Sequence, residues 1–154
     1  MTVFKKIISG GQTGADRAGL DAAAKLGIPS GGFCPKSRRS EDGAIPDKYR
    51  LTETPSPGYA HRTKLNVAVS TATLVLTVGK MTPGSELTAK EARKEGKPCL
   101  WLDLSKPLEK NAAALTRWLD GIGGEVVLNV AGSRESRALG IHDMAEELLL
   151  QALQ

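Results

Sequence analysis

The sequence predicts an α/β fold of three layers, in which helices cover both faces of a mostly parallel sheet of about five strands. Three observations lead to this prediction. Short β-rich runs alternate with segments of helical periodicity along the chain. The run Thr-Leu-Val-Leu-Thr-Val at 73–78 is apolar enough for a strand that is buried on both faces. Glycines and prolines stand between these segments, where turns are needed.

Length and composition restrict the class of protein further. The chain has 154 residues, of which 40% are apolar and 25% charged, so we expect residues 1–154 to form a single Rossmann-like domain. Cys34 and Cys99 show no paired spacing, which favours a reduced, cytoplasmic compartment, and neither a signal peptide nor a membrane span is predicted. The net charge of +4 suits an anionic small ligand, and no basic, aromatic-interleaved segment predicts nucleic-acid binding.

The first part of the chain predicts a strand, a glycine turn and a helix. The strand covers 4–9, and the helix covers 15–26 and ends at Gly27. A second short strand is expected at 30–34. The segment 35–59 then predicts a long loop, which we interpret as a lid that faces the ligand.

The rest of the chain repeats the alternation of strand and helix. We expect Ser85 to cap the second of the helices that follow, and the turn 131–140 to precede the last helix. The expected helices are 59–72, 85–95, 105–119 and 141–152, and the expected strands are 73–78, 98–103 and 125–130.

Three turns stand where an open α/β sheet binds its ligands, at the carboxyl ends of strands. They cover 9–17, 82–88 and 129–137. Adjacent glycines let backbone N–H groups approach an anion, and a helix N-terminus adds partial positive charge. The candidate ligand-binding residues are therefore Gly10, Gly11, Gln12, Thr13, Gly14, Ala15, Asp16, Gly84, Ser85, Thr88, Gly132, Ser133, Arg134 and Ser136.

Structural interpretations of the same residues stay open. The first turn is also compatible with a tight strand-to-helix connection, and Ser85 with a plain helix cap. Arg134 is expected either to bind an anion or to pair with Glu135 or Asp143 in a solvated turn. The basic segment 36–40 is either solvated or closes over a ligand phosphate.

Several kinds of site are disfavoured by the same motifs. The first turn lacks the lysine of a P-loop and the Gly-x-Gly-x-x-Gly register of a dinucleotide site. His61 and His142 lie far apart in the sequence, so no metal ligands are assigned. No nucleophile with an adjacent base is evident, and no catalytic residue is assigned.

The motif Gly-Gly-Gln-Thr-Gly-Ala-Asp-Arg-Ala-Gly-Leu-Asp at 10–21 closely resembles the opening of the molybdenum cofactor carrier family. Motifs at 62–74, 87–88, 129–136 and 140–141 resemble that family in the same order, over nearly the whole chain. The resemblance implies a Rossmann-like, often homo-oligomeric protein that holds the molybdenum cofactor (molybdopterin) or a related phosphorylated ligand without transforming it. A molybdoenzyme would then receive the cofactor.

Two departures from the family pattern affect the expected ligand. Pro83-Gly84-Ser85 stands where the family commonly has Gly-Gly-Thr, and Ser133 stands where it commonly has proline. The fold expectation is unaffected. The sequence favours a non-enzymatic binding protein for an anionic pterin or nucleotide-like ligand.

Two alternative functions remain beside the carrier. The segment 83–91 partly matches the Pro-Gly-Gly-x-Gly-Thr-x-x-Glu motif of the phosphoribohydrolases of the wider superfamily, with Arg62 and Glu91 as the catalytic pair. Two of the motif's glycines are missing, which ranks hydrolysis of nucleoside monophosphates below binding. A sensor of a nucleotide-derived signal is the other alternative.

Overall fold

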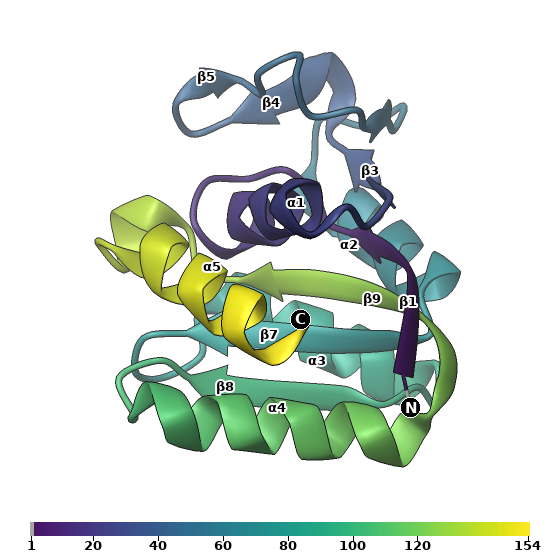
Figure 1. The fold of residues 1–154 in the computed structure, drawn as a ribbon. Coiled ribbons are helices and arrows are strands. Elements are labelled where there is room, and N and C mark those ends of the chain that lie inside the picture. Colours follow the sequence, from purple (N-terminus) through teal and green to yellow (C-terminus); the bar gives the residue numbers. More distant parts are fainter. Residues whose placement is uncertain (1) are drawn as a thin grey trace.

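The computed structural model describes residues 2–154, and its centre is a five-stranded parallel sheet (Figure 1). The strand order is β2-β1-β9-β7-β8, so the last strand in sequence lies between β1 and β7. The strands are β1 (Thr2–Ile8), β2 (Ser30–Gly31), β7 (Ala72–Thr77), β8 (Cys99–Asp103) and β9 (Gly124–Gly132). All four ladders are parallel.

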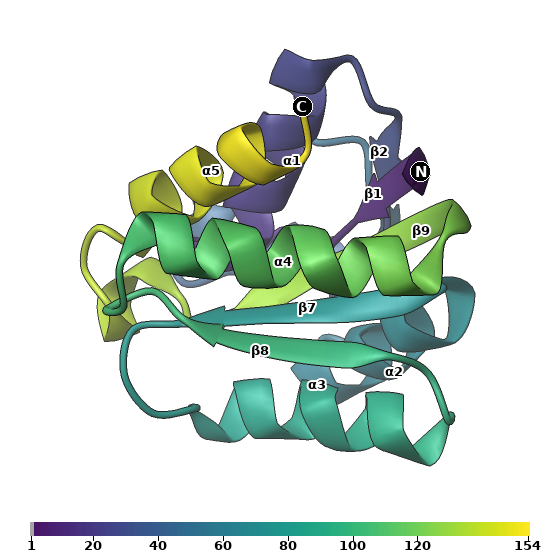
Figure 2. The ribbon, with the colours of Figure 1, turned by 60° about the horizontal axis from the view of Figure 1, so that its bottom comes forward.

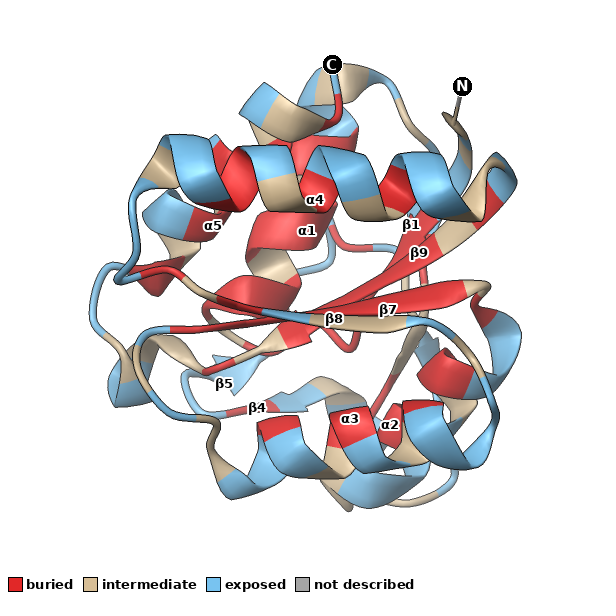
Figure 3. Cartoon of the chain, turned by 90° about the horizontal axis from the view of Figure 1, so that it is seen from below, coloured by how far each residue is buried: buried red, intermediate tan, exposed pale blue. Residues whose placement is uncertain are grey.

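Helices cover both faces of this sheet, which confirms the predicted three-layer Rossmann-like fold (Figure 2). One face carries α1 (Ala15–Leu26), α4 (Leu108–Ile122) and α5 (Ile141–Ala152), and the other carries α2 (Tyr59–Val69) and α3 (Pro83–Lys94). Buried positions face the sheet and exposed ones face outward (Figure 3). Among residues 2–154, no helix is both long and apolar enough to cross a membrane.

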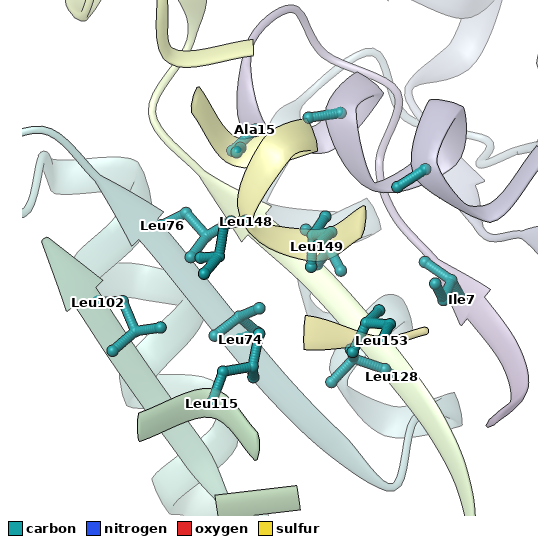
Figure 4. Packing of buried hydrophobic residues seen from close by; sticks show 14 of the residues in the cluster. Ile7, Ala15, Leu74, Leu76, Leu102, Leu115, Leu128, Leu148, Leu149 and Leu153 are labelled. Atoms are coloured by element: carbon teal, nitrogen blue, oxygen red, sulfur yellow. The ribbon is translucent and has the colours of Figure 1, made fainter. Parts of the chain in front are cut away.

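The main hydrophobic core lies between the sheet and helices α1, α4 and α5 (Figure 4). All six residues of β7 are buried, as predicted for a central strand. Burial of a leucine or isoleucine side chain contributes roughly 1.5–3 kcal/mol. The large fully buried side chains of this core are Ile7, Leu74, Leu76, Leu115, Leu128, Ile141, Leu148 and Leu149.

The strand predicted at 30–34 is divided between two sheets. Ser30 and Gly31 pair with β1, whereas β3 (Phe33–Cys34) pairs with β6 (Thr52–Glu53). Gly32, at φ +129°, makes the change of direction, and a Cβ there would meet the carbonyl oxygen of Ser9 at 2.2 Å. The prediction of one continuous strand was therefore wrong.

The segment 35–59 is folded over the start of α1 rather than being structureless. It contains the 3₁₀ turn η1 (Lys36–Arg38) and an antiparallel pair of β4 (Arg39–Ser40) and β5 (Gly43–Ala44). Ile45 and Tyr49 of this segment form a small core with Leu20 and Cys34. Closure of this segment over a ligand stays a prediction.

Two helices begin at positions other than those predicted. Thr82, not Ser85, caps α3: its Oγ1 accepts a hydrogen bond from the Ser85 N–H, and Pro83 occupies the first turn. Helix α4 covers Leu108–Ile122 instead of 105–119. Asp103 Oδ1 accepts bonds from both the N–H and the hydroxyl of Ser105, which keeps Ser105 in the preceding turn.

Candidate functional site

The three predicted turns meet at one edge of the sheet, because β1, β9 and β7 are neighbours in it. They surround a cavity of about 190 Å³, here called the turn cavity. Helix α2 adds the remaining wall. The cavity is lined by Gln12 and Asp16, by Tyr59, Arg62 and Thr63, by Thr82, Pro83, Gly84, Leu87 and Thr88, and by Ala131, Gly132, Arg134 and Arg137.

Direct backbone contact joins the first turn to the third. Ala15 N–H donates to the Ser133 carbonyl at 3.1 Å. Gly14 has φ +81°, and a Cβ on it would meet the same Ser133 oxygen at 2.4 Å. Gly14 and Ser133 thus hold the two turns together, beside the cavity.

Asp16 is a buried carboxyl group that lines the turn cavity. It is 3% exposed, and its Oδ2 accepts a hydrogen bond from the Gln12 N–H at 3.1 Å. The same oxygen lies 3.5 Å from Nη1 of Arg62. Burial raises the pKa of Asp16, and the positive charges of Arg62 and Arg134 only partly oppose this effect.

Arginines gather around the ring of Tyr59. The guanidinium carbons of Arg134, Arg39 and Arg62 lie 4.3, 5.0 and 5.8 Å from the ring centroid. These distances are those of cation–π contacts. The wall formed by α2 and the third turn therefore combines positive charge with a flat aromatic face.

Arg134 does not form the surface ion pair that the sequence allowed. No salt bridge joins it to an acid among residues 2–154. Glu135 instead accepts hydrogen bonds from the N–H groups of Gly140 and His142, and Asp143 pairs with the His142 ring. The Arg134 guanidinium lies instead over the ring of Tyr59.

Two buried polar atoms beside the turn cavity have no hydrogen-bond partner within residues 2–154. They are Oε1 of Gln12 and Nε of Arg62. Gln12 is 2% exposed, and its Nε2 donates to the Arg39 carbonyl at 2.8 Å. Leaving a buried polar group unpaired costs about 1–3 kcal/mol, so these two atoms are exceptions among the buried polar groups of the protein.

Several predicted ligand-binding residues are not among the residues that line the turn cavity. Thr13 and Ser136 both donate to the carboxylate of Glu41, and Ser85 is buried and bonded to Thr82. No local sequence pattern indicates this role of Glu41, which lies in the β4–β5 connection. These contacts position the turns, and direct ligand binding by Thr13, Ser85 and Ser136 stays a prediction.

The basic segment 36–40 is held by the loop that contains it. Arg38 donates to the carbonyls of Ile45, Pro46 and Tyr49. Nearby, Arg17 pairs with Asp42 at 2.7 Å and lowers the pKa of Asp42 to about 2. Of this segment, only Arg39 reaches the arginine group around the Tyr59 ring.

A second cavity, of about 470 Å³, lies between α1 and α5 and is here called the α1–α5 cavity. Acceptor and donor atoms of Asp21, His142 and Glu146 lie within 4.8 Å of one another there. His142 Nε2 is 2.7 Å from Asp21, and Lys25 Nζ is 2.8 Å from Glu146. No local pattern predicts that these residues meet, because α1 and α5 are far apart in the chain.

These features define a three-layer Rossmann-like protein with a cationic cavity where its central strands end. The chain belongs to the circularly permutated YpsA SLOG family, whose model matches residues 7–153. It is also similar to the crystal structure of "Putative molybdenum carrier protein" from Syntrophus aciditrophicus SB, at 42% identity and a TM-score of 0.94. That likeness covers 98% of this chain and 96% of the other, and it confirms the family resemblance seen in the motifs. Comparison with curated proteins gives no match.

Proposed function

We propose that this protein is a non-enzymatic carrier that binds an anionic pterin or nucleotide-like ligand in the turn cavity. The molybdenum cofactor is the ligand we favour. The proposal rests above all on one observation: Arg62 and Arg134 line the turn cavity, with Nε of Arg62 buried and unpaired and Arg134 free of an acidic partner within residues 2–154. Charge-assisted bonds from such groups are worth about 1.5–3 kcal/mol each.

The shape of the site supports a ligand with one charged end. A cavity of about 190 Å³ is smaller than the roughly 300–1,000 Å³ of sites that enclose a whole drug-sized molecule. It suits a phosphate group at the N-termini of α1 and α3, whose dipoles favour negative charge. The ring of Tyr59 would then lie beside the planar part of the ligand.

Family membership supports the identity of the cargo. The Syntrophus protein carries the name of a molybdenum carrier, and its likeness extends over nearly all of both chains. By the family resemblance, we further propose a cytoplasmic homo-oligomer that passes its ligand to a molybdoenzyme. A sensor of a nucleotide-derived signal would use the same cavity and differ in its ligand.

Hydrolysis of a nucleoside monophosphate fits the geometry less well. Cleavage of a glycosidic bond needs a carboxylate that stabilises positive charge at the anomeric carbon. Glu91, the acid of the superfamily motif, is not among the residues that line the turn cavity. Of the two residues of the hydrolase pair, Arg62 alone lines the turn cavity.

Native mass spectrometry of the purified protein tests the carrier directly, because a retained pterin supports it and a retained nucleotide supports the sensor or hydrolase. Arg134→Ala should weaken binding of that ligand by about 1.5–3 kcal/mol, with little change in the melting temperature of the free protein. Arg117→Ala, at an exposed position on α4, is the matched control. Unchanged affinity in Arg134→Ala would remove the main support for the site.

A further inference from the structure

The turn cavity presents hydrogen-bond acceptors as well as positive charge. The Arg39 carbonyl can only accept, so the Gln12 amide must turn its Nε2 toward it, at 2.8 Å. The other amide atom, Oε1, is then fixed as an acceptor, and it has no partner within residues 2–154. Gln12 is 2% exposed, so rotation of its side chain into solvent is not an alternative.

Asp16 adds a second acceptor to the same wall. Its carboxyl group is 3% exposed, lines the cavity and faces Arg62 across 3.5 Å. A negatively charged ligand that has no hydrogen-bond donor could not donate to the Asp16 carboxyl or to Oε1 of Gln12. Its attraction to Arg62 and Arg134 would be offset by these two groups.

We propose that the turn cavity selects anionic ligands that carry a hydrogen-bond donor next to the charged group, with Gln12 as the specificity-determining residue. This inference rests on the proposed function. Hydrogen phosphate and phosphate esters with a neighbouring hydroxyl or amino group belong to the accepted class. Sulfate and molybdate, which hold no proton at neutral pH, belong to the rejected class.

We expect a large difference in affinity between ligands with and without a donor, because a buried acceptor that stays unpaired is costly. Sites built to bond a hydroxyl or amino group reject the analogue that lacks it by as much as about 10⁴–10⁵-fold. For a small inorganic anion, which meets only part of the site, we expect about tenfold or more. If an accepted ligand must carry a hydrogen-bond donor, then a bound molybdenum compound must carry one as well. Free molybdate carries none.

The test is titration calorimetry at neutral pH and constant ionic strength, with inorganic phosphate, sulfate and molybdate as the probes. Phosphate should bind at least about tenfold more tightly than either of the others. Gln12→Met keeps the length of the side chain and removes the acceptor, so phosphate affinity should fall toward that of sulfate. Asp16→Asn places an amide N–H donor where Asp16 has a carboxyl oxygen, so sulfate affinity should rise.

Gln151→Met, at an exposed position near the end of α5, is the matched control and should leave all three affinities unchanged. Circular dichroism of each variant establishes that it is folded, and Asp16→Asn tests the proposal independently if Gln12→Met does not fold. Equal affinity for phosphate and sulfate in the parent protein would overturn the donor rule alone. Absence of binding by every oxyanion, pterin phosphate and nucleotide would overturn the proposed function as well.

Discussion

The turn cavity and the α1–α5 cavity differ in how their polar groups are satisfied. The α1–α5 cavity is the larger of the two, at about 470 Å³, yet four of its charged groups form two pairs, Asp21 with His142 and Lys25 with Glu146. The turn cavity has about 190 Å³ and leaves buried atoms of Gln12 and Arg62 unpaired within residues 2–154. The unpaired buried groups, rather than the volume, are therefore the reason for proposing the turn cavity as the ligand site.

The paired groups of the α1–α5 cavity instead join two helices. Asp21 lies on α1, and it accepts hydrogen bonds from Tyr49 and from His142 of α5. Burial and the nearby Asp21 carboxylate raise the pKa of Tyr49, which keeps the phenol protonated as a donor. If this contrast is correct, substitutions in this cavity change stability, whereas substitutions in the turn cavity change affinity.

The largest expected effect distinguishes two glycines of the turn cavity itself. A Cβ at Gly132 would meet the Leu76 carbonyl oxygen at 1.9 Å, whereas a Cβ at Gly84 meets nothing within 4 Å. Gly132→Ala should lower the free energy of unfolding by about 3 kcal/mol, and Gly84→Ala should change it by less than about 0.5 kcal/mol. Urea denaturation measures both. Similar losses of unfolding free energy in the two variants would mean that Gly84 is as closely packed as Gly132.

Tyr49→Phe should sharpen the contrast between the cavities. The substitution removes the 2.8 Å hydrogen bond to Asp21 and little else, since Tyr49 is 9% exposed and its ring stays packed. We expect a loss of about 1 kcal/mol in unfolding free energy and unchanged affinity for a ligand of the turn cavity. A clear loss of affinity would instead connect the α1–α5 cavity to ligand binding.

The pH dependence of stability gives a smaller effect in the same cavity. Burial disfavours the charged form of His142, but hydrogen bonds to Asp143 and Asp21 outweigh this and raise the pKa of His142. Its contribution is then fully present below the unfolded value of about 6.5 and is lost as the pH rises through the folded value. His142→Gln should thus cost on the order of 0.5 kcal/mol in mildly acid solution and less at alkaline pH. A cost that grows with pH would contradict the charged pairing.

The smallest expected effect is that of Glu91→Gln. Because Glu91 does not line the turn cavity, ligand affinity should change by no more than about 0.5 kcal/mol. We also expect no release of free base from nucleoside monophosphates by the parent protein, as followed by chromatography. Steady turnover by the parent protein that disappears in Glu91→Gln would contradict the carrier function and support the hydrolase function.

The sequence predicted the elements with strong periodicity and missed those without it. The bounds predicted for α1 and α5 match the structure, since apolar stripes and flanking glycines define both helices. The two-residue strands within 35–59 are too short for any periodic pattern, so they were predicted as loop. Gly32, which divides the second strand, shows its role only through contact with Ser9.

The site was predicted in the same uneven way. The three turns follow from the rule that ligands bind at strand ends, and the structure brings these turns together. Tyr59 and its place among the arginines depend on how α2 packs beside the third turn, which no local pattern encodes. Tyr59 and Arg62 are three residues apart, so their shared helix face was the one signal available.

The strand order also determines when during synthesis the ligand site comes into existence. Strand β9, the last strand of residues 2–154, pairs with both β1 and β7, which do not pair with each other. In a nascent chain that ends before Gly124, the place of β9 between β1 and β7 is empty. The turn after β1 and the turn after β7 then have no strand that joins them. Long-range closure of this kind is slow and comes late in folding. Loading of the ligand would consequently have to wait until β9 has left the ribosome and has paired with both neighbours.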